Sequence, residues 1–219
     1  DLNQTHTISL FGVQGGGKSY TLGTIIEMAL IPMEQINVLP RPLATLIFHY
    51  SRTQDYAPEF SSMINPNSVD EEICILRERY NANPEALKNV LILTPGNKVA
   101  ERSTEYPGIE VKPIAFSASE LKAAHWKFLM GAVGSQSLYI RQIKQIMREL
   151  RGDLTLDAFR NAIERSNLAD NLKKLAQTRL LFAGEYIDDS QRLQDLIYPG
   201  RLIIVDLREE YIEKDEALG

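Results

Sequence analysis

The chain has 219 residues, 44% of them hydrophobic, and a formal net charge of −5. This length can bury a core and predicts one large domain, or one domain with an insertion. The acidic balance excludes a basic field over the whole surface, although a local basic strip stays compatible with it. No apolar run reaches the ~18 residues of a membrane span and no signal-peptide pattern opens the chain, so we expect a cytoplasmic protein without a membrane partner.

The first predicted element is a strand over residues 7–11, where apolar and β-branched residues alternate with polar ones. Residues 12–19 then read GVQGGGKS, which fits the phosphate-binding pattern G-x-x-x-x-G-K-[ST]. A helix is predicted from Lys18 to about Ile31, because apolar residues recur there at helical spacing until Pro32 ends it. Strand, glycine loop and helix form the setting that this pattern requires.

The residue types of the loop indicate phosphate chemistry. Glycines let successive backbone N–H groups point at a β-phosphate, and the helix that follows adds the positive end of its dipole. The Lys18 ammonium can reach the β- and γ-phosphates, and the Ser19 hydroxyl can ligate Mg²⁺. The sequence therefore predicts binding of a nucleoside triphosphate by Gly12, Gln14, Gly15, Gly16, Gly17, Lys18, Ser19 and Tyr20.

Further strands are predicted at residues 44–50, 89–94, 109–111 and 201–206, and an acidic helix at residues 67–81. The strand at residues 44–50 should be mostly buried, as in a parallel sheet. Cys74 is the single cysteine, which excludes an internal disulfide framework and suits a reducing cytoplasm. Because Cys74 lies between isoleucines, we expect it to pack in the core.

From Ser117 onward the pattern changes to consecutive helices. Ser117 and Glu120 match a capping box, a second helix is predicted near residues 137–151, and Thr155 should cap a third. Trp126 is expected in the core of this part. We therefore divide the chain into residues 1–115, the N-terminal part of an α/β core; 116–198, an all-helical insertion; and 199–219, a return to the core.

Several landmarks occur in an order typical of one protein family: the glycine loop, the strand and loop over residues 46–56, the ILTPG segment at residues 92–96, the helical insertion, and GRLIIVDL at residues 200–207. In this order the chain resembles the HerA/FtsK-type motor ATPases, the HerA branch in particular. The resemblance implies an α/β, RecA-like P-loop NTPase with a mostly parallel sheet that is interrupted by the helical insertion. It also implies ATP and Mg²⁺ as cofactors and a homo-oligomer, typically a hexameric ring, on duplex DNA. A nuclease or other effector would be its partner, in DNA-end processing or antiviral defence.

The chain departs from the family pattern at two places. In residues 48–56 only Tyr56 echoes the turn that usually follows the second strand. The strand at residues 202–206 ends in Asp206, which could lie near Mg²⁺ as a Walker-B-like carboxylate. The resemblance favours another interpretation, in which the catalytic Asp/Glu pair lies beyond Gly219, because Leu207 and Arg208 are not the expected continuation. Lys18 is then the main catalytic residue, with Asp206 and Arg208 as further candidates.

For several other residues, both a functional and a structural interpretation are open. Arg201 or Arg208 could stabilise the γ-phosphate of a neighbouring subunit, but each is more typical of a structural ion pair. The helical repeat of Arg141, Lys144, Arg148 and Arg151 could contact DNA phosphates, although a solvated helix flank is favoured. His49 stands at the carboxyl end of a strand, where ligands bind, but packing is favoured there too.

The leading functional hypothesis is an ATP-driven DNA translocase. The alternatives are an ATP-stabilised ring scaffold for an effector and, third, a small-molecule kinase.

Overall fold

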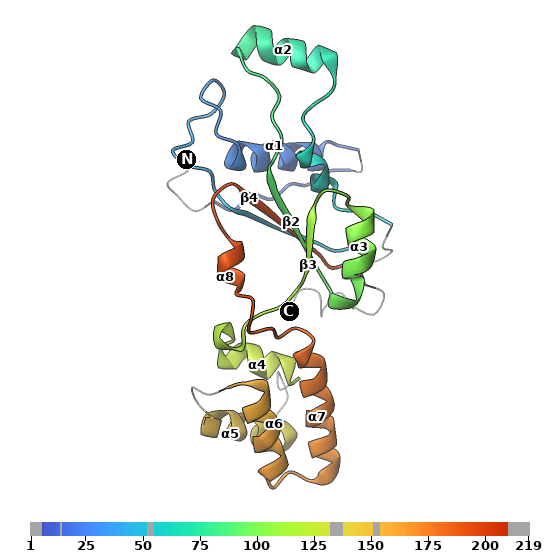
Figure 1. Cartoon of the computed structure of the whole chain (residues 1–219), viewed down its shortest axis with the longest axis vertical. Helices are drawn as coiled ribbons and strands as arrows, with labels where there is room; N and C mark the ends of the chain where they lie inside the picture. The colour runs from blue at the N-terminus through green and yellow to red at the C-terminus, as the bar shows by residue number, and fades with distance from the viewer. Residues whose placement is uncertain (1–5, 14, 52–54, 132–137, 151–153, 210–219) are drawn as a thin grey trace.

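The computed structural model describes residues 6–13, 15–51, 55–131, 138–150 and 154–209 (Figure 1). Its sheet contains β1 (Thr45–His49), β2 (Asn89–Thr94), β3 (Glu110–Pro113) and β4 (Arg201–Asp206). The strand order is β1-β4-β2-β3, and every neighbouring pair is parallel. The predicted α/β class with a parallel sheet is therefore confirmed. The last described strand, β4, lies in the interior of the sheet, between β1 and β2.

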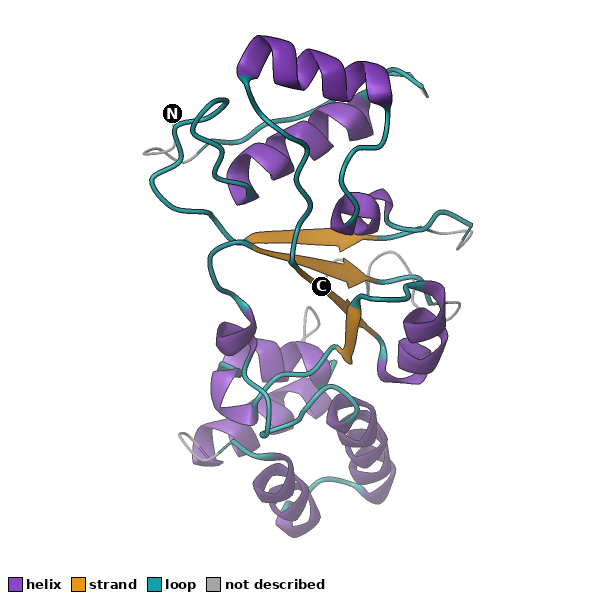
Figure 2. Cartoon of the chain, turned by 45° about the horizontal axis from the view of Figure 1, so that its top comes forward, coloured by secondary structure: helices purple, strands orange, loops and turns teal. Residues whose placement is uncertain are grey.

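Helices cover both faces of the sheet (Figure 2). On one face α1 (Lys18–Leu30) packs through Ile26 and Leu30 against a buried cluster that includes Ile92 and Ile204. On the other face Leu196 of α8 (Leu193–Leu196) joins a second cluster with neighbouring strand residues. All six residues of β4 are buried, because this strand has a strand on each side and a covered face above and below.

The edge strand β1 departs from its prediction. Its residues are not mostly buried, since Leu46 is 41% and Phe48 is 67% exposed. Both residues lie on the same face as Ile203 and Val205 of β4, but the cluster around α8 does not extend to them. The pattern of apolar residues was correct for a strand, whereas the expectation of two covered faces was wrong.

Two further expectations are wrong. Residues 7–11 form no strand, and Ile8 and Phe11 are 63% and 90% exposed. A β-prone segment becomes a strand only when another strand satisfies its backbone groups, and no described strand pairs with this one. Cys74 is exposed rather than in the core, because α2 (Asp70–Tyr80), the helix that carries it, has no buried residue.

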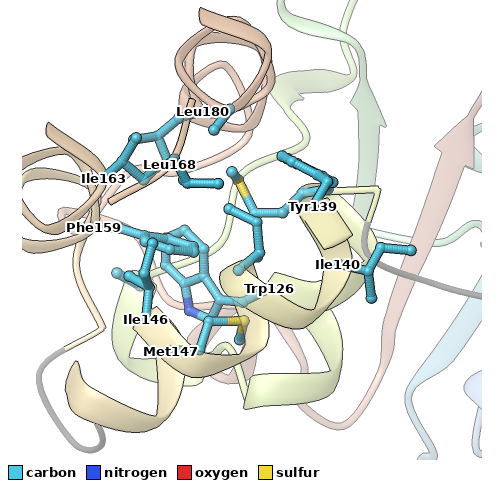
Figure 3. Close-up of a cluster of buried hydrophobic side chains, with 13 residues drawn as sticks. Trp126, Tyr139, Ile140, Ile146, Met147, Phe159, Ile163, Leu168 and Leu180 are labelled. Atoms are coloured by element: carbon cyan, nitrogen blue, oxygen red, sulfur yellow. The ribbon is translucent and has the colours of Figure 1, made fainter. Parts of the chain in front are cut away.

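Helices α4 (Ala123–Leu129), α5 (Leu138–Leu150), α6 (Leu156–Arg165) and α7 (Asp170–Gly184) share a hydrophobic cluster of their own (Figure 3). At its centre the fully buried Trp126 and Phe159 pack in a T-shaped pair with ring centroids 5.7 Å apart. The prediction of Trp126 as a core residue is confirmed. So is the Thr155 cap, whose hydroxyl accepts a hydrogen bond from the Ala158 N–H at 3.2 Å.

The capping box at Ser117 and Glu120 exists, but it caps only the short 3₁₀ turn η3 (Ala118–Glu120). The helix predicted to follow this capping box therefore begins later, since α4 starts at Ala123. Glu120 serves a second purpose, since its carboxylate also accepts hydrogen bonds from the N–H groups of Leu193 and Gln194 at 3.1 and 3.3 Å. One segment of the chain leads from the sheet into these helices and another leads back to the sheet. The Glu120 hydrogen bonds and the bridge between Phe116 and Ile187 join these two segments.

The remaining described elements are η1 (Glu59–Ile64), which packs beside α1, and η2 (Gly96–Lys98) with α3 (Val99–Glu105), which connect β2 to β3. The predicted bounds of the strand at residues 89–94 are thus confirmed.

Candidate phosphate-binding site

Two backbone hydrogen bonds place the glycine loop relative to the sheet. The Leu43 N–H donates to the Ala29 carbonyl, and the Gly200 N–H donates to the Leu43 carbonyl, both at 2.8 Å. The carboxyl end of α1 therefore lies at the amino ends of β1 and β4. Since a helix of this kind runs antiparallel to the strands that it covers, the amino end of α1 points toward the carboxyl edge of the sheet, where α/β proteins bind ligands.

Glycine is favoured at three successive positions of the loop. Gly15 and Gly17 have φ angles of 78° and 75°, in the left-handed region that other residues adopt only with strain. Gly16 has an ordinary φ, but a Cβ there would lie 3.1 Å from the Val13 carbonyl oxygen, to which the Gly16 N–H donates. The loop geometry therefore explains the run of three glycines. Gln14 lies outside the described residues.

The Lys18 side chain curls back over the loop. Its Nζ donates to the carbonyl oxygens of Gly12 and Val13, at 3.0 and 2.7 Å. A phosphate oxygen is a stronger acceptor for an ammonium than a neutral carbonyl is. The ammonium is therefore held beside the loop in a position from which an anion can attract it.

The first turn of α1 adds donors to the same place. The backbone N–H groups of Lys18, Ser19 and Tyr20 have no helical acceptor, and none finds another backbone acceptor among the described residues. The first turn contains no acidic residue that would repel an anion. The free N–H groups and the helix dipole thus favour negative charge at this end of the helix.

A magnesium ion would find one protein ligand here. The Ser19 hydroxyl is exposed and forms no hydrogen bond with any described residue. Among the described residues there is no group of three or more His, Cys, Asp or Glu side chains that could hold a metal ion. The donor set therefore fits a Mg²⁺ ion held by Ser19 together with phosphate and water oxygens, and does not fit an ion held by the protein alone.

Asp206 lies in a buried ionic network at the end of β4. Its carboxylate is fully buried and accepts hydrogen bonds from Arg208, at 2.9 Å from Nε and 2.7 Å from Nη2. The Arg102 Nε lies 3.2 Å from the same carboxylate, and Glu105 bonds both arginines at 2.9 Å. The Tyr106 hydroxyl accepts from Arg208 at 2.6 Å.

The network shifts the pKa values of two of its side chains, Tyr106 and Arg208. Burial, and next the hydrogen bond to Glu105, raise the pKa of the Tyr106 hydroxyl far above its usual value. Burial would lower the pKa of Arg208, but the hydrogen bonds and charge of Asp206 outweigh burial and raise it. The network therefore keeps Arg208 charged and Tyr106 neutral at every ordinary pH.

Arg201 and Arg208, the two arginine candidates for a γ-phosphate contact, both have partners within the chain. Arg208 is 4% exposed within the network, and Arg201 donates to Glu110 at 2.7 Å and lies over the Tyr198 ring. In this structure both arginines are ion-pair partners within the chain. A catalytic role for Asp206, or one for Arg208 across a subunit interface, stays a prediction and would require these bonds to rearrange.

The basic helix flank is compatible with either of its interpretations. Arg141 and Arg148 are exposed and Lys144 is half-buried, and none forms an ion pair with a described residue. Arg151 lies outside the described residues. His49 uses its Nε2 in a 2.6 Å hydrogen bond with the Tyr56 carbonyl oxygen, so it ties the end of β1 to the loop that follows.

Thr94, which was predicted only as part of the ILTPG segment and not as a site residue, lies at the same edge of the sheet. Thr94 is the last residue of β2, it is fully buried, and its hydroxyl has no hydrogen-bond partner within the structure described. Because Leu93 pairs with Val205, Thr94 lies level with Asp206. Besides the ILTPG segment, the signal in the sequence was a polar residue that ends an apolar strand.

Comparison of the chain with protein families, curated proteins and solved structures finds no match. The observed fold and site define a parallel α/β protein with a glycine loop at a helix amino end. Of the helices within the described ranges, none is long and apolar enough to cross a membrane.

Proposed function

We propose that the loop at residues 12–19 binds ATP and that the chain is the ATPase of a HerA/FtsK-type motor. One observation carries the proposal: the Lys18 ammonium lies 3.0 and 2.7 Å from the loop carbonyls of Gly12 and Val13, at a helix amino end that points toward the carboxyl edge of a parallel sheet. Glycine-loop geometry, a free first helical turn and a cation beside it are together what a polyphosphate requires.

On binding, the N–H groups of the loop and of the first turn of α1 would surround the β-phosphate. Lys18 would leave the two carbonyls and bond the β- and γ-phosphate oxygens. The Ser19 hydroxyl would help to hold a Mg²⁺ ion, which would supply charge neutralisation for the phosphates. In hydrolysis, water attacks the γ-phosphorus, the bond to the β–γ bridging oxygen breaks, and ADP leaves. Lys18 stabilises the negative charge that develops during this transfer.

Hydrolysis also needs a carboxylate that orients the attacking water. Asp206 is engaged by two buried arginines, so we propose that a residue other than Asp206 fills this role.

The motor assignment rests on the order of the sequence landmarks. Residues 92–96 contain the end of β2, and residues 200–207 contain the interior strand β4. We propose a homo-oligomeric ring, typically a hexamer, that acts in the cytoplasm on duplex DNA beside a nuclease or other effector. The exposed Arg141 and Arg148 are the described candidates for contacts with DNA phosphates.

The second candidate function is a ring that ATP stabilises and that holds an effector without translocating. The engagement of Asp206 by arginines favours it, because an Asp206 carboxylate that stays paired in this way cannot orient water for hydrolysis. A kinase for small molecules, the third candidate, has no further observation in its favour.

The test measures binding of a fluorescent ATP analogue and ATP turnover, with and without linear duplex DNA. Lys18→Ala should weaken binding at least tenfold, because it removes a charge-assisted contact to phosphate. Lys88→Ala removes an exposed lysine outside the loop and serves as the matched control.

Turnover that DNA stimulates, and that Lys18→Ala abolishes, would support the motor. Lys18-dependent binding with no effect of DNA on turnover would support the scaffold instead. Equal binding by the native chain and Lys18→Ala would refute the site itself.

A further inference from the structure

Helix α2, Asp70–Tyr80, stands apart from the rest of the protein (Figure 1). It is 11 residues long and has no buried residue, and Ile75 and Tyr80 are 44% and 48% exposed. A helix this short is marginal in water unless another element packs against it. Ile73 and Leu76 are half-buried, whereas the described chain leaves Ile75 and Tyr80 without a covering surface.

One face of α2 has a symmetric distribution of charge. Glu72, Ile75, Leu76 and Arg79 follow one another at the i, i+3, i+4 and i+7 spacing that brings residues onto a single face. The apolar pair is in the middle, the acid is toward the amino end and the base toward the carboxyl end. Arg79 forms no ion pair with any residue that the structure describes, and Glu72 accepts only from the amide of Asn67.

We propose that α2 is a self-association surface, which pairs with α2 of a second copy of this chain in an antiparallel arrangement. A two-fold axis between Ile75 and Leu76 sets Glu72 opposite Arg79 of the second copy, and Arg79 opposite that copy's Glu72. Each Ile75 then packs against Leu76 of the other helix. This closed, self-complementary contact is the commonest symmetry among soluble oligomers.

The charges on α2 determine both which partner binds it and in which direction the partner's helix runs. A parallel pair would place Glu72 beside Glu72 and Arg79 beside Arg79, and like charges at such distances are unfavourable. The acid and the base that complement each other lie on the same helix, so a second copy supplies both partners. The surface lies outside the glycine loop, and the proposal does not depend on nucleotide binding.

The contact is small. Two helices of this length bury less area than the roughly 1,600 Å² of a standard interface, so we expect a reversible dimer with a dissociation constant in the micromolar range. Sedimentation equilibrium of the full chain, without nucleotide and up to about 100 µM, should show a concentration-dependent dimer.

Charge reversal tests the geometry. Glu72→Arg and Arg79→Glu should each weaken the dimer about tenfold, because each change turns two attractive pairs into two repulsive ones. An equimolar mixture of the two variants should associate at least as well as the native chain. Arg77→Glu makes the same charge change on the opposite side of the helix and should leave association unchanged. Ile75→Asp should abolish the dimer.

The distance between the two Cys74 side chains of a dimer provides an independent test of the antiparallel arrangement. It is the only cysteine of the chain, it is exposed, and helical spacing puts it on the side away from the proposed contact. Spin labels on the two Cys74 side chains should lie roughly 25–35 Å apart, since packed helices are 8–10 Å from axis to axis.

A chain that stays monomeric at 100 µM would overturn the proposal. So would a dimer that both charge reversals leave unchanged, a mixture of variants that fails to associate, or a dimer without the expected label distance. Any of these results would assign the exposed face of α2 to a different partner.

Discussion

Replacing Asp206 by alanine tests whether this residue holds the sheet edge together or acts in catalysis. The change removes a fully buried carboxylate from Arg208 and from Arg102, whose side chains are 4% exposed. Removing one partner of a buried ion pair costs about 3–5 kcal/mol, since the remaining charge stays buried without its counter-ion. Glu105, at 31% exposure, still bonds both arginines, so we expect the lower end of this range, about 3 kcal/mol.

For a chain of this length, 3 kcal/mol corresponds to a Tm that is lower by roughly 6–12 °C. Urea unfolding followed by circular dichroism should give the same loss of free energy with an unchanged m-value. The control is Asp157→Ala, which removes an ion pair with Arg160. The Asp157 side chain in this pair is 85% exposed. This exposed pair should contribute less than about 1 kcal/mol.

A loss of less than about 1 kcal/mol in Asp206→Ala would refute the structural role. If the same variant kept its stability but lost ATP turnover, Asp206 would be a catalytic residue, and the arginines would have to release it during the reaction.

Three other changes test separate parts of the structure. Gly17→Ala forces a φ of 75° on alanine and should cost about 1–2 kcal/mol of loop strain, seen as weaker binding of an ATP analogue; unchanged binding would contradict the loop geometry. Phe159→Ala should destabilise the helical cluster by about 3–5 kcal/mol, followed by the fluorescence of Trp126, the only tryptophan, and a loss below 1 kcal/mol would argue against that packing. Burial raises the pKa of Glu120, but hydrogen bonds from three backbone N–H groups outweigh burial and lower this pKa. The stability that Glu120 contributes should therefore be complete above its unfolded pKa of about 4.3. It should disappear as the pH falls through the lower pKa of the folded state. The difference in unfolding free energy between the native chain and Glu120→Gln, measured in urea from pH 7 to pH 3, should therefore shrink toward acid; a constant difference would refute this.

Much of the local structure follows from short sequence patterns. The glycine loop and its helix, the strands β2 and β4, and the Thr155 cap were predicted from residues that are neighbours in the chain. Such features depend on periodicity, backbone freedom and capping, which a sequence displays directly. The position of Lys18 beside the loop is of the same kind, because its acceptors lie five and six residues away.

Features that depend on distant partners were not predictable in the same way. The ionic network joins Asp206 and Arg208 to Arg102 and Glu105, about a hundred residues earlier, and no periodicity reports that contact. The same holds for Thr94, whose burial follows from its place beside β4.

The errors share this cause. Residues 7–11 have the composition of a strand and Cys74 has the neighbours of a core residue. Yet residues 7–11 pair with no described strand, and Cys74 lies on a helix that has no buried residue. The sequence by itself determined the loop that can hold a phosphate and the identity of most helices and strands. Only the tertiary structure decided which strand lies inside the sheet, which stays at its edge, and which charges meet, because backbone pairing and burial are properties of the neighbour in space.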